Sequence, residues 1–225
     1  MRRPAVLLIA LLAALVLAGA CSSGSKGSSK SESTTSEAPT SSIPPAAQPA
    51  QGALPWAAPA NPMELAAQAS LTPETAESLQ FHVHAHLDVF LNGTAQLVPG
   101  GIGIDITNPG VHTFGSGDQA QYGGITTPCD KPCISPLHTH GPDGILHTES
   151  KTPTPNKLGQ FFTEWGVKLD ATCVGGYCKP DTSVLIYVNG KKFTGDPTTI
   201  ELADKTEIAV VIGSLPSSIP SKAPF

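Results

Sequence analysis

The chain has 225 residues, with 18 acidic and 13 basic side chains and a formal net charge of −5. Both arginines, Arg2 and Arg3, stand at its start, so a chain cut after residue 20 keeps 11 lysines and a net charge of −7. Such a chain lacks the guanidinium that binds phosphate in a bidentate manner, and its charge repels nucleic acid. The composition therefore disfavours nucleic-acid binding and favours a cationic partner such as a metal ion.

Residues 1–20 have the pattern of an export signal, because two arginines precede an apolar run that is too short to span a bilayer. The ending LAGAC resembles the bacterial lipoprotein signal, although Ala18 stands where that family prefers leucine. The resemblance implies that Cys21 is lipidated and anchors an exported protein to the outer face of the cell membrane. Ordinary cleavage near Ala20, which leaves Cys21 as a free thiol, is the alternative.

Composition divides the rest of the chain into three parts. Residues 21–60 are rich in Ser, Thr, Pro and Ala, which cannot bury enough apolar surface to fold, so we expect a disordered tether. Residues 61–214 are long enough for one domain with a sizeable core. Residues 215–225 resemble a flexible tail.

The domain begins with two short helical signals, Asn61-Pro62 and Thr72-Pro73, which predict brief helices at residues 63–69 and 74–79. Asn92-Gly93 predicts a tight hairpin, with the return strand at 94–98 and 102–106. Residues 108–136 are rich in Gly and Pro without clear periodicity, and predict a long loop.

Strict alternation over the sequence FHVHAHLDVFLNG predicts a strand from Phe81 to Leu91 with one apolar face. The opposite face carries His82, His84, His86 and Asp88. Imidazoles two residues apart on a strand start roughly 6.6 Å apart, and both can lean onto one ion at about 2.0–2.1 Å.

A second histidine cluster lies in LHTHGPDGILHTE, where residues 141–144 predict a turn between two extended runs. If that turn closes a hairpin, His138 pairs with His147, and His140 pairs with Ile145. Because His138 and His140 share a strand face, the three imidazoles then converge on one patch.

Four cysteines lie in the domain, and an even number in an exported chain predicts disulfides. Local pairing of Cys129 with Cys133 and of Cys173 with Cys178 is the simplest of three connectivities. A redox pair or thiolate ligands to a metal are the alternatives, but neither pair has the C-x2-C spacing typical of both.

The second half of the domain predicts one amphipathic helix at residues 156–167, capped by Asn156 and carrying an aromatic stripe that covers a sheet. Strands follow at 183–188, 191–194 and 207–212. This order predicts an α+β fold with a mixed or antiparallel sheet and one main covering helix. The C-terminal run resembles the ending of ubiquitin-like β-grasp domains, which implies a similar arrangement of its last strands.

Several blocks together resemble a group of exported bacterial and archaeal proteins without an assigned activity. These blocks are HxHxHL at residues 82–87, LHTHxxxGIxHxES at 137–150 and LGQFFxxWG at 158–166. Because that group supplies no activity, the expected mechanism rests on the chemistry of the residues.

Clustered imidazoles favour a transition metal, and with the cysteines cross-linked the candidates are Cu(II) and Zn(II). The predicted ligands are His82, His84, His86, His138, His140 and His147. Asp88 and Glu149 are expected to orient the imidazoles or to bind directly. The histidines could hold one ion or two.

Three functions follow from these residues. The first is a lipid-anchored protein that buffers, senses or delivers a divalent metal, with an unidentified protein partner in the case of delivery. The second is a metal-dependent oxidase, dioxygenase or hydrolase that uses the same histidines. The third is an interaction domain with a solvated histidine face. Its histidine side chains bind no ligand, which is also what we expect of His112.

Overall fold

The structure is a computed structural model that describes residues 55–125 and 127–225. The expected export signal, Cys21 and residues 22–54 of the expected tether lie outside these ranges. Among the helices of the described ranges, none combines the length and apolarity that a membrane span requires.

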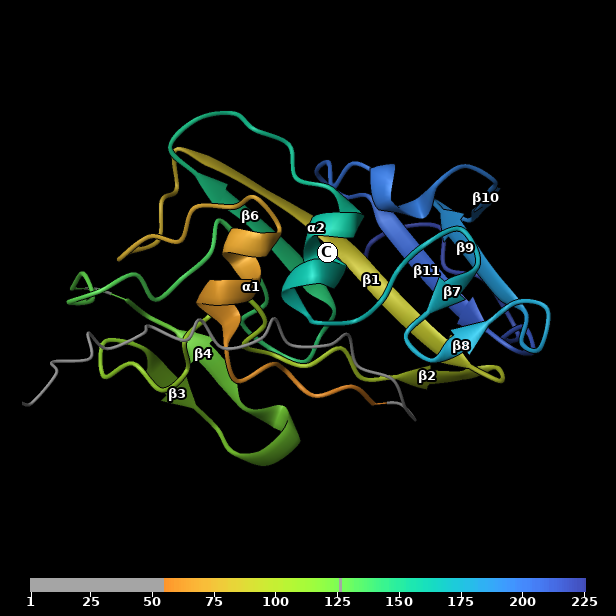
Figure 1. Cartoon of the computed structure of the whole chain (residues 1–225), viewed down its shortest axis with the longest axis horizontal. Helices are drawn as coiled ribbons and strands as arrows, with labels where there is room; N and C mark the ends of the chain where they lie inside the picture. Colours follow the sequence, from red (N-terminus) through yellow and green to blue (C-terminus); the bar gives the residue numbers. More distant parts are fainter. Residues whose placement is uncertain (1–54, 126) are drawn as a thin grey trace, which may run out of the picture. The chain divides into compact units, whose positions relative to one another are not determined.

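A mixed sheet with the strand order β10-β9-β11-β1-β6-β5 forms the centre of the fold, and β2 also pairs with β1 (Figure 1). Strands β1 and β11 run parallel, and the other neighbours are antiparallel. The expected α+β class with a mixed sheet is therefore confirmed. The strands of this sheet are β1 (Phe81–Leu91), β2 (Thr94–Gln96), β5 (Leu137–His138), β6 (Ile145–Ser150), β9 (Val184–Val188), β10 (Lys191–Phe193) and β11 (Glu207–Ile212).

Alternation along the two central strands determines which side of the sheet holds the main core. Ala85, Leu87 and Val89 of β1 are each 1% exposed and belong to that core. The parallel neighbour β11 is buried on both faces, as its apolar run requires. Its Ala209 and Val211 pack with Phe90 on the face away from the main core.

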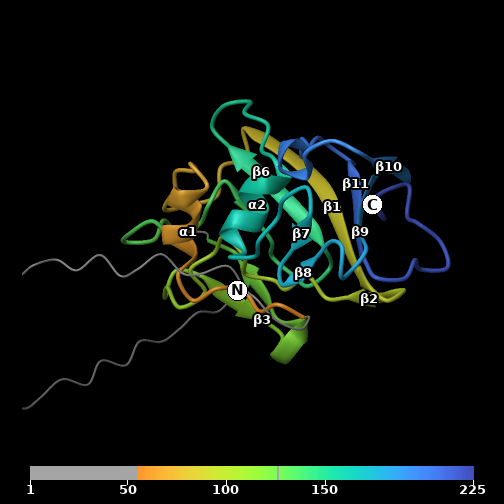
Figure 2. The same ribbon diagram turned by 45° about the vertical axis from the view of Figure 1, so that its right-hand side comes forward.

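Helix α2 (Leu158–Glu164) covers the core face of the sheet, and helix α1 (Pro62–Gln68) packs beside it (Figures 1 and 2). The aromatic side chains of the predicted stripe lie in the core. The helix begins after Lys157 rather than after Asn156, because the Gln160 side chain accepts a hydrogen bond from the Lys157 backbone N–H at 2.9 Å. Asn156 is buried instead and donates to the hydroxyl of Thr148 at 3.2 Å.

Three local predictions are wrong. Residues 74–79 form no helix, because Glu74 pairs with Ile134 in an isolated antiparallel bridge. The return strand after β1 is only β2, since Pro99 and the glycines that follow it turn the chain. The long loop contains a two-stranded sheet, formed by β3 (His112–Phe114) and β4 (Gln121–Gly123), with a 3-10 turn between them at Gly117–Gln119. A second 3-10 turn, Pro197–Thr199, precedes β11.

The predicted local disulfides are confirmed. Cys129 is bonded to Cys133, with Cα atoms 6.4 Å apart, and the backbone N–H groups of these two residues donate to the carbonyls of Thr75 and Glu74 at 2.8 Å. The first disulfide thus fixes the segment that leads into β1 against the segment that leads into β5.

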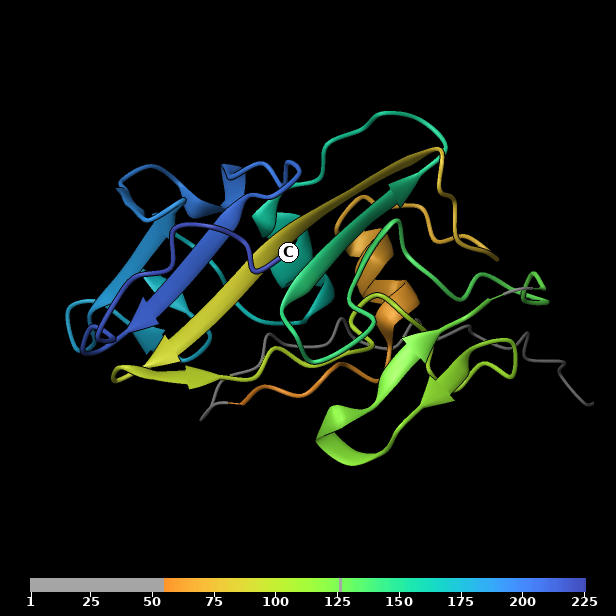
Figure 3. The same cartoon turned by 180° about the vertical axis from the view of Figure 1, so that it is seen from behind.

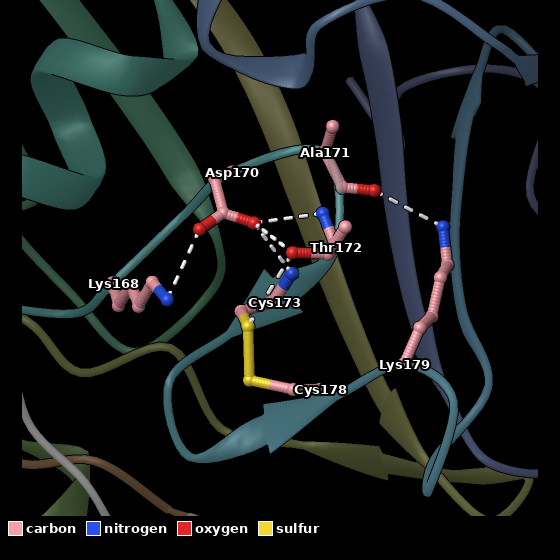
Figure 4. Close-up of a disulfide and its surroundings, with 7 residues drawn as sticks. All are labelled: Lys168, Asp170, Ala171, Thr172, Cys173, Cys178 and Lys179. Atoms are coloured by element: carbon pink, nitrogen blue, oxygen red, sulfur yellow. Dashed lines mark hydrogen bonds and ion pairs between the residues drawn. A yellow bond between two sulfur atoms is a disulfide. The ribbon is translucent and has the colours of Figure 1, made fainter.

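The second disulfide joins Cys173 and Cys178 across the hairpin of β7 (Cys173–Val174) and β8 (Tyr177–Cys178), with Cα atoms 4.2 Å apart (Figure 4). The carboxylate of Asp170 accepts hydrogen bonds from the backbone N–H groups of Thr172 and Cys173, each at 2.7 Å. Both bonded pairs suit an oxidising compartment outside the cytoplasm.

Residues before and after the expected domain also pack on it. Trp56 is 4% exposed and meets Trp165 edge to face, with ring centroids 5.5 Å apart. On the opposite face of the sheet, the last residues cross toward β1 (Figure 3), Ile219 packs against the Phe90 cluster, and the Phe225 ring lies 5.8 Å from that of His84.

Candidate metal centre

Histidines of β1 lie on the face of the sheet that points away from α2, because they alternate with Ala85, Leu87 and Val89 of the main core. The register of three adjacent strands sets His84 of β1 opposite His147 of β6, and His147 opposite His138 of β5. His82 is likewise opposite Glu149. Residues directly opposite one another share a face, so the two histidine clusters predicted from the sequence form one.

His138 and His140 have defined protonation on one ring nitrogen each. The Nδ1 of His138 lies 2.8 Å from the carbonyl oxygen of Ser135, and the Nδ1 of His140 lies 2.6 Å from that of Tyr122. A carbonyl oxygen can only accept a hydrogen bond, so both Nδ1 atoms carry the proton and donate it. In the neutral rings the Nε2 atoms are therefore left with lone pairs.

These two lone pairs point at each other. The Nε2 atoms of His138 and His140 are 3.2 Å apart. Neither neutral ring has a proton to place between them, so the contact needs a cation. Two nitrogens that each lie about 2.0–2.1 Å from one tetrahedral ion are roughly 3.3 Å apart, which agrees with the observed separation.

Burial keeps His138 neutral. Its side chain is 1% exposed, and burial, with a further contribution from His140, lowers the pKa of His138 from 6.5 to about 3. His138 therefore keeps the lone pair on its Nε2 at neutral pH, and a metal ion placed between the two Nε2 atoms would bind both rings without protonating His138.

His147 lies at the centre of the cluster. Its ring centroid is between 4.4 and 5.9 Å from those of the other four histidines, His82, His84, His138 and His140. Its Nδ1 atom is 3.1 Å from the Nε2 of His84 and 3.4 Å from the Oε1 of Glu149. Burial and the nearby His147 and His82 lower the pKa of His84, which keeps that ring neutral as well.

Glu149 supplies the negative charge among these imidazoles. Its Oε1 lies 3.1 Å from the Nε2 of His82 and 3.9 Å from the Nε2 of His138. Burial alone would raise the pKa of Glu149, but the hydrogen bond with His147 and the charges of His138 and His82 outweigh it and lower the pKa to about 2. The Oε2 atom of this buried, ionised carboxylate has no hydrogen-bond partner among the described residues.

A second carboxylate, Glu77, reaches the same place and was not predicted from the sequence. Its buried Oε1 also has no partner within the described ranges, and burial, followed by the charge of Glu149, raises the pKa of Glu77. A cavity of about 10 Å3 is lined by Glu77, His138 and Glu149 together with Ser135. Such a volume holds about one water-sized species.

Backbone geometry determines where the two hydrogen-bonded histidines point. A Cβ atom at Gly123 would lie 2.8 Å from the Nδ1 of His140, so only glycine lets β4 approach closely enough for the Tyr122 carbonyl to accept from that ring. Ser135, whose carbonyl fixes His138, lies two residues after the cross-linked Cys133. Neither carbonyl could be identified from the sequence, because backbone acceptors leave no signature in it.

His86 lies in a separate group with Asp88 and Glu207. Its Nδ1 is 2.9 Å from the Glu207 carboxylate and 3.8 Å from that of Asp88, and its Nε2 donates to the carbonyl of Asp143 at 3.0 Å. Burial lowers the pKa of His86, but the hydrogen bond and charge of Glu207 outweigh it and raise the pKa. Both ring nitrogens thus face acceptors, so the ring has no lone pair to offer an ion while it is protonated.

The structure therefore brings five of the six predicted histidines together with Glu149, and sets His86 and Asp88 apart. Donor atoms within 4.8 Å of one another come from His138, His140, His147 and Glu149 in one set, from His82, His84 and His147 in a second, and from His86, Asp88 and Glu207 in a third. His140 has left the ladder, since the pairing of β5 with β6 includes only Leu137 and His138, and its expected partner Ile145 pairs with His86 instead. His112 is exposed and stacks on Phe114.

Comparison of the chain with protein-family models, with curated proteins and with solved structures gave no match. The functional assignment accordingly rests on the geometry of the histidine cluster, and the resemblance suggested by the histidine blocks stays a prediction.

Proposed function

We propose that this protein binds one Cu(II) or Zn(II) ion through His138, His140, His147 and Glu149, in order to buffer or deliver that metal outside the cytoplasm. One observation carries the proposal: two imidazoles, each held through its Nδ1 by a backbone carbonyl, direct their Nε2 atoms at each other across 3.2 Å. Without a cation, this arrangement is repulsive.

The donor set selects the class of metal. It consists of imidazole nitrogens and one carboxylate, which suit Cu(II) and Zn(II). The four domain cysteines are in disulfides and offer no thiolate to a softer ion. Where both ions are present at similar concentrations, the general affinity order of such sites favours copper.

The location expected from the sequence would suit a role in handling metal at the cell surface. Lipidation of Cys21 would place the domain at the outer face of the membrane, on the segment rich in Ser, Thr and Pro that precedes Trp56. Mass spectrometry of the intact protein should find a diacylglyceryl-modified Cys21, and Cys21→Ala should move the protein from the membrane to the soluble fraction. An unmodified cysteine in membrane-bound protein would rule out this anchor.

Metal binding can be tested on the full, tag-free chain. After removal of metal, calorimetric titration with Cu(II) or Zn(II) should show tight binding, and the double variant His138→Ala/His140→Ala should weaken it by at least a hundredfold. A loss of two imidazole ligands removes more than the ten- to hundredfold typical of a supporting residue.

The matched control is His112→Ala, which removes an exposed histidine outside the cluster and should leave the affinity unchanged. Circular dichroism should show that both variants are folded. Wild-type protein that binds neither ion, or a double variant that binds as well as wild type, would refute the proposed function.

A further inference from the structure

A second set of donors lies on the more exposed side of His147 and is not needed by the ion proposed above. His82 and His84 lie two residues apart on β1, with ring centroids 4.5 Å apart. The Nε2 of His84 is 3.1 Å from the Nδ1 of His147, and the Nε2 of His82 is 3.1 Å from Glu149 Oε1. Both separations match those expected for two ligands of a shared ion.

The number of donors exceeds what one ion takes. Zn(II) in protein sites is almost always four-coordinate, and His138, His140, His147 and Glu149 already supply four ligands. With a single ion bound, His82 and His84 would direct their ring nitrogens at the ligands of that ion without binding the ion themselves. The close nitrogen pairs are also distinct, since one joins His138 to His140 and the other joins His84 to His147.

Two residues lie between the sets. The carboxylate of Glu149 contacts His82 and His147 through Oε1, while its Oε2 is without a partner among the described residues. His147 belongs to both sets and has two ring nitrogens. A carboxylate and an imidazole in these positions are suited to be ligands shared by two ions.

We propose that the histidine face holds two divalent ions side by side, the inner one at His138 and His140 and the outer one at His82 and His84, with His147 and Glu149 as ligands between them. This inference rests on the proposed function, because the outer ion shares ligands with the inner one. His86 has no part in it, since both of its nitrogens are already hydrogen-bonded.

The two ions should bind in order. His138 is fully buried, whereas the side chain of His82 is 33% exposed. Two cations a few ångströms apart repel each other, and the carboxylates of Glu149 and Glu77 offset only part of that repulsion. The inner ion therefore binds first and tightly, and the outer ion binds second with at least about tenfold lower affinity.

The test is a titration of the metal-free, tag-free full chain with Cu(II), followed by calorimetry and by electron paramagnetic resonance. We expect two Cu(II) per chain in two steps. At one equivalent the spectrum should be that of isolated Cu(II), and at two equivalents that signal should weaken while a half-field transition appears from coupling between neighbouring spins.

The variant His82→Ala/His84→Ala should bind one Cu(II) with the affinity of the first step and give only the isolated spectrum. The milder change His82→Gln, at an exposed side chain, should weaken the second step alone and serves if the double variant does not fold. The control His112→Ala should still bind two ions.

The outcomes separate the two proposals. A wild-type protein that binds a single Cu(II), or a His82→Ala/His84→Ala variant that still binds two with spin coupling, overturns the two-ion centre and leaves the proposed function in place. A wild-type protein that binds no Cu(II) and no Zn(II) overturns both.

Discussion

His84 and His86 are neighbours on the same face of β1, yet the structure gives them opposite chemistry. His84 lies opposite His147 on β6, and its pKa is lowered. His86 lies opposite Glu207 on β11, and its pKa is raised. The residue supplied by the adjacent strand thus decides whether an imidazole keeps a free lone pair for a metal or becomes half of a buried ion pair.

The contributions of the histidine cluster and of the His86 group to stability should respond oppositely to pH, which is the largest effect we expect. The pKa of His138 is about 3 in the fold and 6.5 in the unfolded chain, so below pH 6.5 the unfolded chain binds the extra proton. The free energy of unfolding of metal-free protein should therefore fall as pH drops from 6.5 to 3, by up to about 5 kcal/mol. His86, whose folded pKa is raised, adds stability below pH 6.5 that is lost as pH rises through that pKa.

Urea unfolding in the presence of a chelator, between pH 3 and pH 9, measures both effects. His138→Gln should flatten the acid side of the profile, and His86→Gln should flatten the alkaline side. The acid loss from Glu149, whose pKa is also lowered, remains unchanged in His86→Gln, and only part of it is lost in His138→Gln because His138 contributes to that lowering. An acid side that is as steep in His138→Gln as in wild type would contradict the assignment of a neutral, buried ring.

Removing the carboxylate that distinguishes the two groups should destabilise the fold without affecting the metal. Glu207 is 1% exposed, and Glu207→Ala leaves His86 buried without its anion. Breaking such a buried pair costs on the order of 3 kcal/mol, which a shift in the urea midpoint would reveal.

The control for this change is Asp88→Asn, at a carboxylate 3.8 Å from the same ring and partly exposed, which should cost far less. Cu(II) affinity should stay within about twofold of wild type in both variants, because neither residue is part of the cluster around His147. A large loss of affinity in Glu207→Ala would mean that the two groups are coupled.

The smallest effect should come from Glu77, which faces the cluster without a hydrogen bond at its Oε1 among the described residues. Glu77→Gln removes a negative charge beside the ion and should weaken Cu(II) binding by about tenfold, as measured by calorimetry. Glu74→Gln is the matched control, since Glu74 is in the same segment but pairs with Lys151 at the surface. Equal affinities for the two variants would remove Glu77 from the site.

Much of this arrangement could be predicted from local sequence. The period-2 alternation from Phe81 to Leu91 is enough to predict a strand with histidines on one face, and the GPDG turn is enough to pair His138 with His147. The aromatic stripe also identified the helix that covers the other face. These are short-range patterns, in which spacing along the chain determines geometry.

The remaining features depend on long-range pairing. Nothing in the sequence shows that β1 lies between β6 and β11, which is what unites His84 with His147 and separates His86. Glu207 is the first residue of a strand that is otherwise a buried apolar run. That single charge was the one signal in the sequence for the separate group around His86. Glu77 was assigned to a helix that does not form, so its position at the cluster could not be seen.

The Cys129–Cys133 bond makes assembly of the centre depend on oxidation of the chain. The backbone N–H groups of its two cysteines donate to Glu74 and Thr75 and hold the segment that carries Glu77. The same loop continues into Ser135, which orients His138. We infer that reduction of this bond would release these groups from alignment, so the reduced domain should bind Cu(II) and Zn(II) more weakly than the oxidised one.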